Sequence, residues 1–170
     1  SLVVDDAPVS LAAFEEAFSR SSDRAPCWSG SGTILEPDGT LLTNAHVALN
    51  VRQTEPRWLL VLRTVDSRSE PEPAFIGVAV ASSPRQKLDL AVVEPAFALD
   101  GRPIQPGGLT MRPLPMAQPG VIDIGDEILN IGYPNIGGRL ITLSRGAASG
   151  LAPDNGVPEL GNAGWIKTDA

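Results

Sequence analysis

The stretch Thr40-Leu41-Leu42-Thr43-Asn44-Ala45-His46-Val47 carries the only histidine in 170 residues, at the end of an apolar, strand-like run. A second apolar run, Gly30–Leu35, precedes it, and Glu36–Gly39 between the two runs has proline and glycine where a tight turn favours them. The two runs therefore predict a β-hairpin with His46 at its far end. Val47–Leu49 favours a helical turn, so His46 would lie where a strand passes into a short helix, and catalytic side chains concentrate at such junctions. A lone histidine is also a common core or surface residue, so the rest of the chain has to decide between these roles.

The N-terminal segment has the pattern of one amphipathic helix. Apolar residues recur there at helical spacing, with acidic residues on the other side and a good N-cap before them: Leu11, Phe14 and Phe18, then Glu15 and Glu16, and Ser10. The pattern predicts a helix at about residues 10–20. We expect it to pack on the β domain that follows, and a contact with a partner or a regulatory role is the alternative.

The remainder of the chain has the pattern of strands. Apolar, β-rich runs occur at Trp58–Leu62, Ala74–Val80, Leu88–Val93, Glu127–Ile131, Arg139–Ser144, Ala147–Leu151 and Trp165–Thr168. Pro84–Lys87 predicts an exposed turn. Proline and glycine are so frequent between residues 94 and 119 that we expect neither a helix nor a central strand there. The segment therefore predicts a crossover between two β units.

Composition excludes several classes of protein. With 13 Lys and Arg against 20 Asp and Glu, a net charge of −7 argues against a nucleic-acid partner. No apolar run approaches the length of a membrane span. One histidine and one cysteine, Cys27, cannot build a zinc centre of the usual types or an intrachain disulfide, and the Gly137-Gly138 pair precedes no helix that could bind phosphate. We therefore expect no metal and no cofactor.

Four motifs stand in a fixed order along the chain. They are Gly30–Leu35 with Leu42–Val47, then Leu88–Val93, then Gly125–Pro134, and finally Trp165–Ala170. In this order they resemble the chymotrypsin- or trypsin-like serine proteases and, more narrowly, the bacterial HtrA/Deg branch. The resemblance covers nearly the whole chain from Gly30 onward. It implies an all-β fold of two six-stranded-type antiparallel barrels, the second of them incomplete in this chain.

Joined to the strand pattern, the resemblance divides the chain into four parts. These are an N-terminal helix and connector (1–29), a first β-barrel (30–94), a Pro-rich interdomain crossover (95–119) and part of a second β-barrel (120–170). The compartment stays open between the cytoplasm and the bacterial envelope, because no basic-then-apolar signal peptide begins at Ser1 and a processed chain would lack one.

The resemblance also implies roles for two side chains. A serine hydroxyl needs a base that takes its proton and returns it to the leaving amine, and His46 matches the position of that base. A buried carboxylate holds the imidazole in one tautomer and stabilises its charged form, and Asp89 matches that position. Asp89 stands between Leu88 and Leu90, where a buried carboxylate costs several kcal/mol unless it is paired. An aspartate that faces water at a strand edge is the alternative.

The nucleophile is expected outside the 170 residues. In the family, a Gly-x-Ser-Gly-Gly loop follows the Thr-Asp-Ala segment within a few residues, and this sequence stops at Ala170. Ser31, Ser144 and Ser149 lie neither in that motif nor in the Gly-x-Ser-x-Gly of the α/β-hydrolases. We therefore expect the 170 residues alone to be inactive, with the serine supplied beyond Ala170 or by a second chain. Much of the specificity pocket is expected there too, so the cleavage preference stays open.

Two functions are compatible with the sequence. The first is a serine endopeptidase that acts on polypeptides. The second is a non-catalytic module that keeps the protease fold to bind a peptide or a partner. The presence of both His46 and Asp89 favours the first, because a pure binding module has no chemical need for the pair. An unrelated all-β domain would require four motifs to coincide in order by chance.

Overall fold

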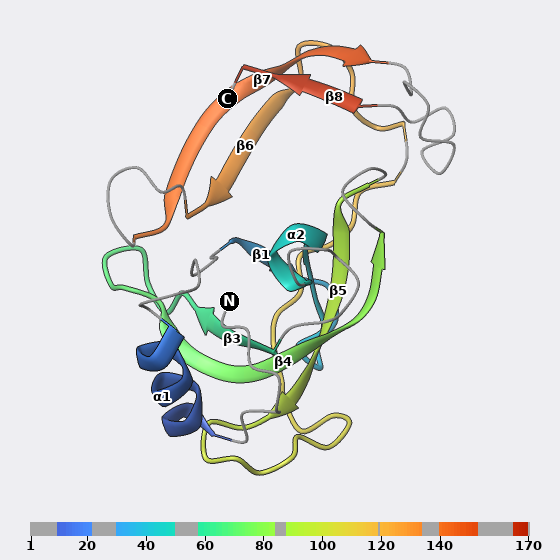
Figure 1. The fold of residues 1–170 in the computed structure, drawn as a ribbon. Helices are drawn as coiled ribbons and strands as arrows, with labels where there is room; N and C mark the ends of the chain where they lie inside the picture. Colours follow the sequence, from blue (N-terminus) through green and yellow to red (C-terminus); the bar gives the residue numbers. More distant parts are fainter. Residues whose placement is uncertain are drawn as a thin grey trace. The chain divides into compact units, whose positions relative to one another are not determined.

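The computed structural model describes residues 10–21, 30–49, 58–83, 88–118, 120–133, 140–152 and 165–169 (Figure 1). The chain divides into two compact units, Ser1–Leu114 and Pro115–Ala170. Both are built mainly from antiparallel strands, which confirms the all-β class. Cys27, Gly137, Gly138 and the turn expected at Pro84–Lys87 lie outside the described residues.

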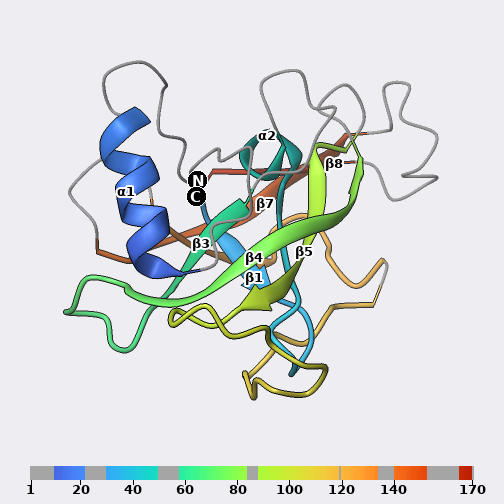
Figure 2. The same ribbon diagram turned by 60° about the horizontal axis from the view of Figure 1, so that its bottom comes forward.

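In the residues that the structure describes, the first unit is a curled five-stranded sheet with two helices. Its helices are α1 (Leu11–Ser21) and α2 (Ala45–Ala48), and its strands are β1 (Gly32–Ile34), β2 (Leu41–Asn44), β3 (Trp58–Arg63), β4 (Glu72–Ser83) and β5 (Leu90–Phe97). The strands lie in the order β1-β2-β5-β4-β3, with antiparallel neighbours throughout. Figure 2 shows how the long strand β4 bends, so that the sheet curls into half a barrel.

The hairpin predicted around Glu36–Gly39 is present and joins β1 to β2. Ile34 pairs with Leu41, and the Gly39 N–H donates to the Glu36 carbonyl at 3.1 Å. Gly39 has a φ of +95°, a conformation that L side chains rarely adopt, so glycine is required at this position. The hairpin carries β2 toward the junction at which His46 lies.

One apolar core holds this sheet together. Its buried members come from β2, α2 and the residue that follows it, β3, β4 and β5: Leu41, Ala45, Val47, Ala48, Leu49, Leu59, Phe75, Ala91 and Val93. Buried residues alternate with more exposed ones along β2 and along Leu90–Glu94 of β5, as expected for strands with one covered face. Because α2 contributes three of the buried residues, the backbone on both sides of His46 is anchored.

Helix α1 packs on the first unit, as predicted. Phe14 is 3% exposed and packs with Ile76 of β4, and the Leu11 N–H donates to the carbonyl of Leu99 at 2.8 Å. Ser10 caps the helix by accepting a hydrogen bond from the Ala13 N–H at 3.2 Å. Neither α1 nor α2, the helices of the described segments, is long and apolar enough to cross a membrane.

Strand β5 extends further than the sequence predicts. The sequence predicts a strand that ends at Val93 and neither a helix nor a central strand between residues 94 and 119, yet β5 continues through Pro95 to Phe97. Pro95 pairs with Gly77 of β4, whereas the pairing of β5 with β2 stops at Val93. A proline is tolerated here because its missing N–H would face no partner strand on the β2 side. Gly77 is required opposite it, since a Cβ there would lie 2.8 Å from Val93 Cγ1 and 3.0 Å from the Glu94 carbonyl oxygen.

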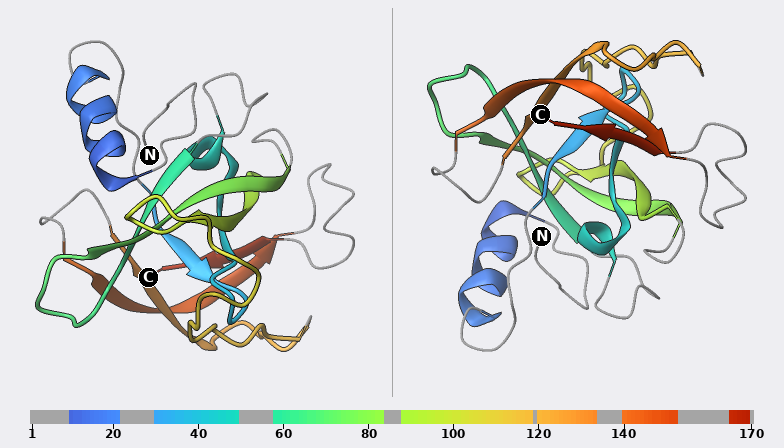
Figure 3. Two further views of the ribbon diagram at one scale, coloured as in Figure 1. Left: turned by 90° about the horizontal axis from the view of Figure 1, so that it is seen from below. Right: turned by 90° about the horizontal axis from the view of Figure 1, so that it is seen from above.

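The second unit, in its described residues, is a three-stranded antiparallel sheet in the order β6-β7-β8 (Figure 3). Its strands are β6 (Glu127–Gly132), β7 (Thr142–Ala152) and β8 (Trp165–Thr168). The prediction of two strands at Arg139–Ser144 and Ala147–Leu151 is wrong, because β7 is continuous. Arg145 and Gly146 keep their pairing with Leu129 and Ile128, so the glycine lies inside a strand and makes no turn.

Candidate active site

His46 lies at the junction of a strand and a helix. Strand β2 ends at Asn44 and α2 begins at Ala45, so the imidazole projects from the first turn of a short helix. Its neighbours Ala45 and Val47 are 0% and 5% exposed, whereas the His46 side chain is 38% exposed. The backbone is therefore fixed by the core while the ring stays accessible.

Asp89 lies just before β5 and has an unusual backbone. The prediction that it belongs to a buried strand at Leu88–Val93 is wrong, since β5 begins at Leu90. Its φ is 53°, and it is the only non-glycine residue of the described segments with a positive φ. Aspartate enters this left-handed region more readily than most residues, because its short polar side chain can form local hydrogen bonds. The Asp89 side chain is 20% exposed, so it is not fully buried.

The structure brings His46 and Asp89 together. Nδ1 of the ring lies 2.7 Å from Asp89 Oδ2, and the His46 backbone N–H donates to Asp89 Oδ1 at 3.0 Å. Both carboxylate oxygens thus contact one residue, which fixes the carboxylate plane relative to the ring. A carboxylate can only accept a hydrogen bond, so Nδ1 of the neutral ring is the donor, and Nε2 keeps its lone pair.

The backbone of Asp89 is held by the same segment. Its carbonyl oxygen accepts hydrogen bonds from the Ala45 N–H at 3.0 Å and from Asn44 Nδ2 at 3.1 Å. Asn44 was not identified from the sequence as part of the site. The available signal was an asparagine at the end of a strand and two residues before the histidine, where a helix N-cap is the ordinary expectation.

The three serines considered as possible nucleophiles lie in two different parts of the structure. The Ser31 carbonyl accepts a hydrogen bond from Thr43 Oγ1 at 2.8 Å, which ties the start of the hairpin to β2. Thr43 is 7% exposed, so this bond satisfies a buried hydroxyl. Ser144 and Ser149 lie in β7 of the second unit.

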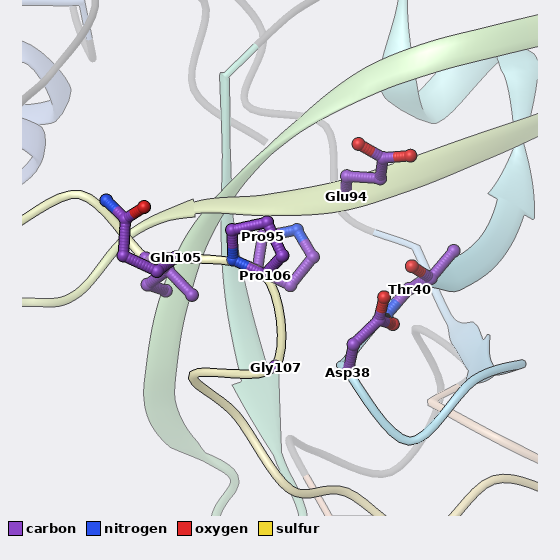
Figure 4. Close-up of a pocket in the computed structure, with 8 residues that line it drawn as sticks. Asp38, Thr40, Glu94, Pro95, Gln105, Pro106 and Gly107 are labelled. Carbon is purple, nitrogen blue, oxygen red and sulfur yellow. Dashed lines mark hydrogen bonds between the residues drawn. The ribbon is translucent and has the colours of Figure 1, made fainter.

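The first unit has a cavity of about 290 Å³ whose lining differs from the residues around His46 and Asp89 (Figure 4). It is lined by Asp38, Thr40, Glu94, Pro95, Ile104, Gln105, Pro106 and Gly107, and so by neither His46 nor Asp89. A hydrogen bond from the Thr40 backbone N–H holds the pKa of Asp38 below its ordinary value.

Across the segments that the structure describes, no group of three or more His, Cys, Asp or Glu side chains could hold a metal ion.

Two comparisons with known proteins show which family this chain resembles. The family model of the trypsin-like peptidase domain matches residues 30–170. A curated protein of Synechocystis sp. (strain ATCC 27184 / PCC 6803 / Kazusa), named "Putative serine protease HhoA", is 29% identical over 169 residues and aligns with 92% of this chain. The chain spans 36% of that relative's length. The family match covers most of the residues of this chain, His46 and Asp89 among them. The chain therefore belongs to the trypsin-like peptidase family.

Proposed function

We propose that this chain forms part of a serine endopeptidase of the HtrA/Deg branch, in which His46 is the general base and Asp89 is the carboxylate that orients it. The observation that carries the proposal is the 2.7 Å contact between His46 Nδ1 and Asp89 Oδ2. It is supported by the match to the trypsin-like peptidase domain and by the similarity to a protein named as a serine protease.

In the proposed mechanism the two ring nitrogens of His46 have separate roles. Nε2 accepts the proton of a serine hydroxyl as the oxygen attacks the carbonyl carbon of a peptide bond, and it then donates that proton to the leaving amine. An acyl-enzyme remains, and water, activated by the same nitrogen, hydrolyses it. Asp89 keeps the hydrogen on Nδ1 and stabilises the imidazolium that forms in each step. The exposed fraction of the ring, 38%, leaves room for the attacking group.

The serine itself is proposed to come from outside Ser1–Ala170. The sequence contains no Gly-x-Ser-Gly-Gly motif, and in the family that motif follows the segment corresponding to Trp165–Ala170. Either a continuation of the same chain or a second chain would supply the hydroxyl and the backbone N–H groups that stabilise the oxyanion. The polypeptide substrate would then bind between those groups and His46.

The test is peptide hydrolysis by the natural protein that contains this chain. We expect His46→Ala to lower kcat by at least about 10⁴-fold, because no other group takes the serine proton. Gln105→Ala, an exposed change in a loop of the first unit, serves as the control and should leave kcat within twofold of the unsubstituted protein. The 170 residues by themselves should hydrolyse no peptide.

Two results would contradict the proposal. Hydrolysis that persists in His46→Ala would remove the histidine from the mechanism. A natural protein that binds peptides but cleaves none would favour the non-catalytic binding module.

A further inference from the structure

Asn44 stands at the N-cap position of α2 but does not cap it. Its backbone is extended, with φ −76° and ψ 143°, and its side chain makes no capping hydrogen bond. Asparagine at this position ordinarily accepts a hydrogen bond from an N–H of the first helical turn. The side chain instead donates from Nδ2 to the carbonyl oxygen of Asp89, 3.1 Å away.

Asp89 performs the capping in its place. The Ala45 N–H donates to the Asp89 carbonyl at 3.0 Å, and the His46 N–H donates to Asp89 Oδ1 at 3.0 Å. These N–H groups have no partner within the helix, so an outside acceptor is needed. Because a residue 43 positions along the chain supplies it, the Asn44 amide is available for another contact.

The backbone of Asp89 needs that contact. Its φ of 53° lies in the left-handed region, which costs free energy for a residue with a Cβ. Such a conformation persists only when its surroundings hold it, and here two donors, from Ala45 and Asn44, converge on one carbonyl oxygen. In this conformation the carboxylate reaches both the ring and the backbone N–H of His46.

We propose that Asn44 is a positioning residue for the His46–Asp89 pair. Its amide holds the left-handed backbone of Asp89, and thereby keeps Asp89 Oδ2 within 2.7 Å of His46 Nδ1. The proposal rests on the proposed function, in which this pair activates the nucleophile. Asn44 acts through Asp89 and is not itself a catalytic residue.

Asn44→Asp separates positioning from capping. Aspartate has nearly the shape of asparagine and is an equally good N-cap residue, but it has no N–H donor and would place a carboxylate against the Asp89 carbonyl. We expect kcat of the natural protein to fall roughly three- to tenfold with KM unchanged, the effect of losing one hydrogen bond that supports the transition state. Asn44→Ala removes the donor without adding charge and should act in the same direction. Gln105→Glu, an equal change of charge at an exposed loop position, is the control and should change neither quantity.

A second readout is independent of hydrolysis. His46 is the only histidine of the 170-residue chain, so every imidazole ¹⁵N signal of that chain comes from this ring. We expect the fraction of neutral rings with hydrogen on Nδ1 to fall in both Asn44 variants and to stay constant in Gln105→Glu. Thermal melting of the same samples measures any loss of stability.

Three results would overturn the proposed role of Asn44. Unchanged kcat and unchanged ring signals in both Asn44 variants would overturn the proposal, and so would a lower melting temperature with unchanged ring signals. An equal effect in Gln105→Glu would assign the change to net charge and would also overturn it. If His46→Ala leaves hydrolysis intact, the proposed function fails, and the ring signals still decide whether Asn44 positions Asp89.

Discussion

Replacing Asp89 with asparagine should lower kcat of the natural protein by about 10⁴-fold while the site keeps its shape. The amide oxygen of the new residue can still accept the His46 backbone N–H that Asp89 Oδ1 accepts at 3.0 Å. In the unsubstituted protein Asp89 Oδ2 lies 2.7 Å from His46 Nδ1. In the variant the asparagine NH₂ group takes the place of Oδ2 and donates a hydrogen bond to Nδ1. The ring hydrogen moves to Nε2, so the nitrogen that should accept the serine proton is already protonated.

The matched control is Asp66→Asn, which makes the same chemical change in an exposed turn of the first unit. Asp66 accepts hydrogen bonds from the Arg68 and Ser69 N–H groups at 2.7 and 2.9 Å, contacts that an asparagine oxygen can also make. Peptide hydrolysis should stay within about twofold of the unsubstituted protein, because surface changes have small effects. Equal losses of kcat in the two variants would argue against a specific role for Asp89.

Replacing Phe75 with alanine should lower the free energy of unfolding of the first unit by about 3–5 kcal/mol. Phe75 is 0% exposed and belongs to the core cluster that contains Leu41, Ala45 and Val93. The lost ring would leave a cavity that the β4 and β5 backbones, paired along most of their length, cannot easily close. Because Ala45 and Val47 flank His46 in the same core, the loss of packing should also loosen the site.

The measurement is hydrogen exchange of the β4 and β5 amides, which reports on the first unit separately from the second. Val80→Ala is the control, since Val80 lies in the same strand but is 51% exposed, and its effect should stay within about 0.5 kcal/mol. A change below about 1 kcal/mol in Phe75→Ala would show that Phe75 does not hold the core together.

The position of His46 was predictable because the local signals agree. The apolar run of β2, the turn at Glu36–Gly39 and the segment Val47–Leu49 favour a hairpin that passes into a helical turn, and the structure contains both elements. The likeness of the ordered motifs to the trypsin-like proteases pointed to the family, and the match over residues 30–170 confirms it.

The details that were missed depend on pairing between distant segments. The apolar residues of Leu88–Val93 favour a short buried strand, and nothing local shows that Asp89 turns to a φ of 53° before β5 begins. That backbone is held by hydrogen bonds from Asn44 and Ala45, more than forty positions earlier. Pro95 likewise looks like the end of a strand until the pairing shows that β2 no longer lies beside it. The predicted strands Arg139–Ser144 and Ala147–Leu151 are one continuous strand, β7, because Arg145 and Gly146 between them pair with Leu129 and Ile128 of β6.

The most direct test of His46 as the base for a serine nucleophile is covalent labelling of the natural protein with a fluorophosphonate, followed by mass spectrometry of its peptides. The reagent reacts with a serine whose proton is removed by an adjacent base, so it reports activation without depending on a chosen substrate. The proposed function predicts one adduct per molecule, on a single serine outside Ser1–Ala170, with labelling lost in His46→Ala. Absence of any adduct, or labelling that persists unchanged in His46→Ala, would contradict it.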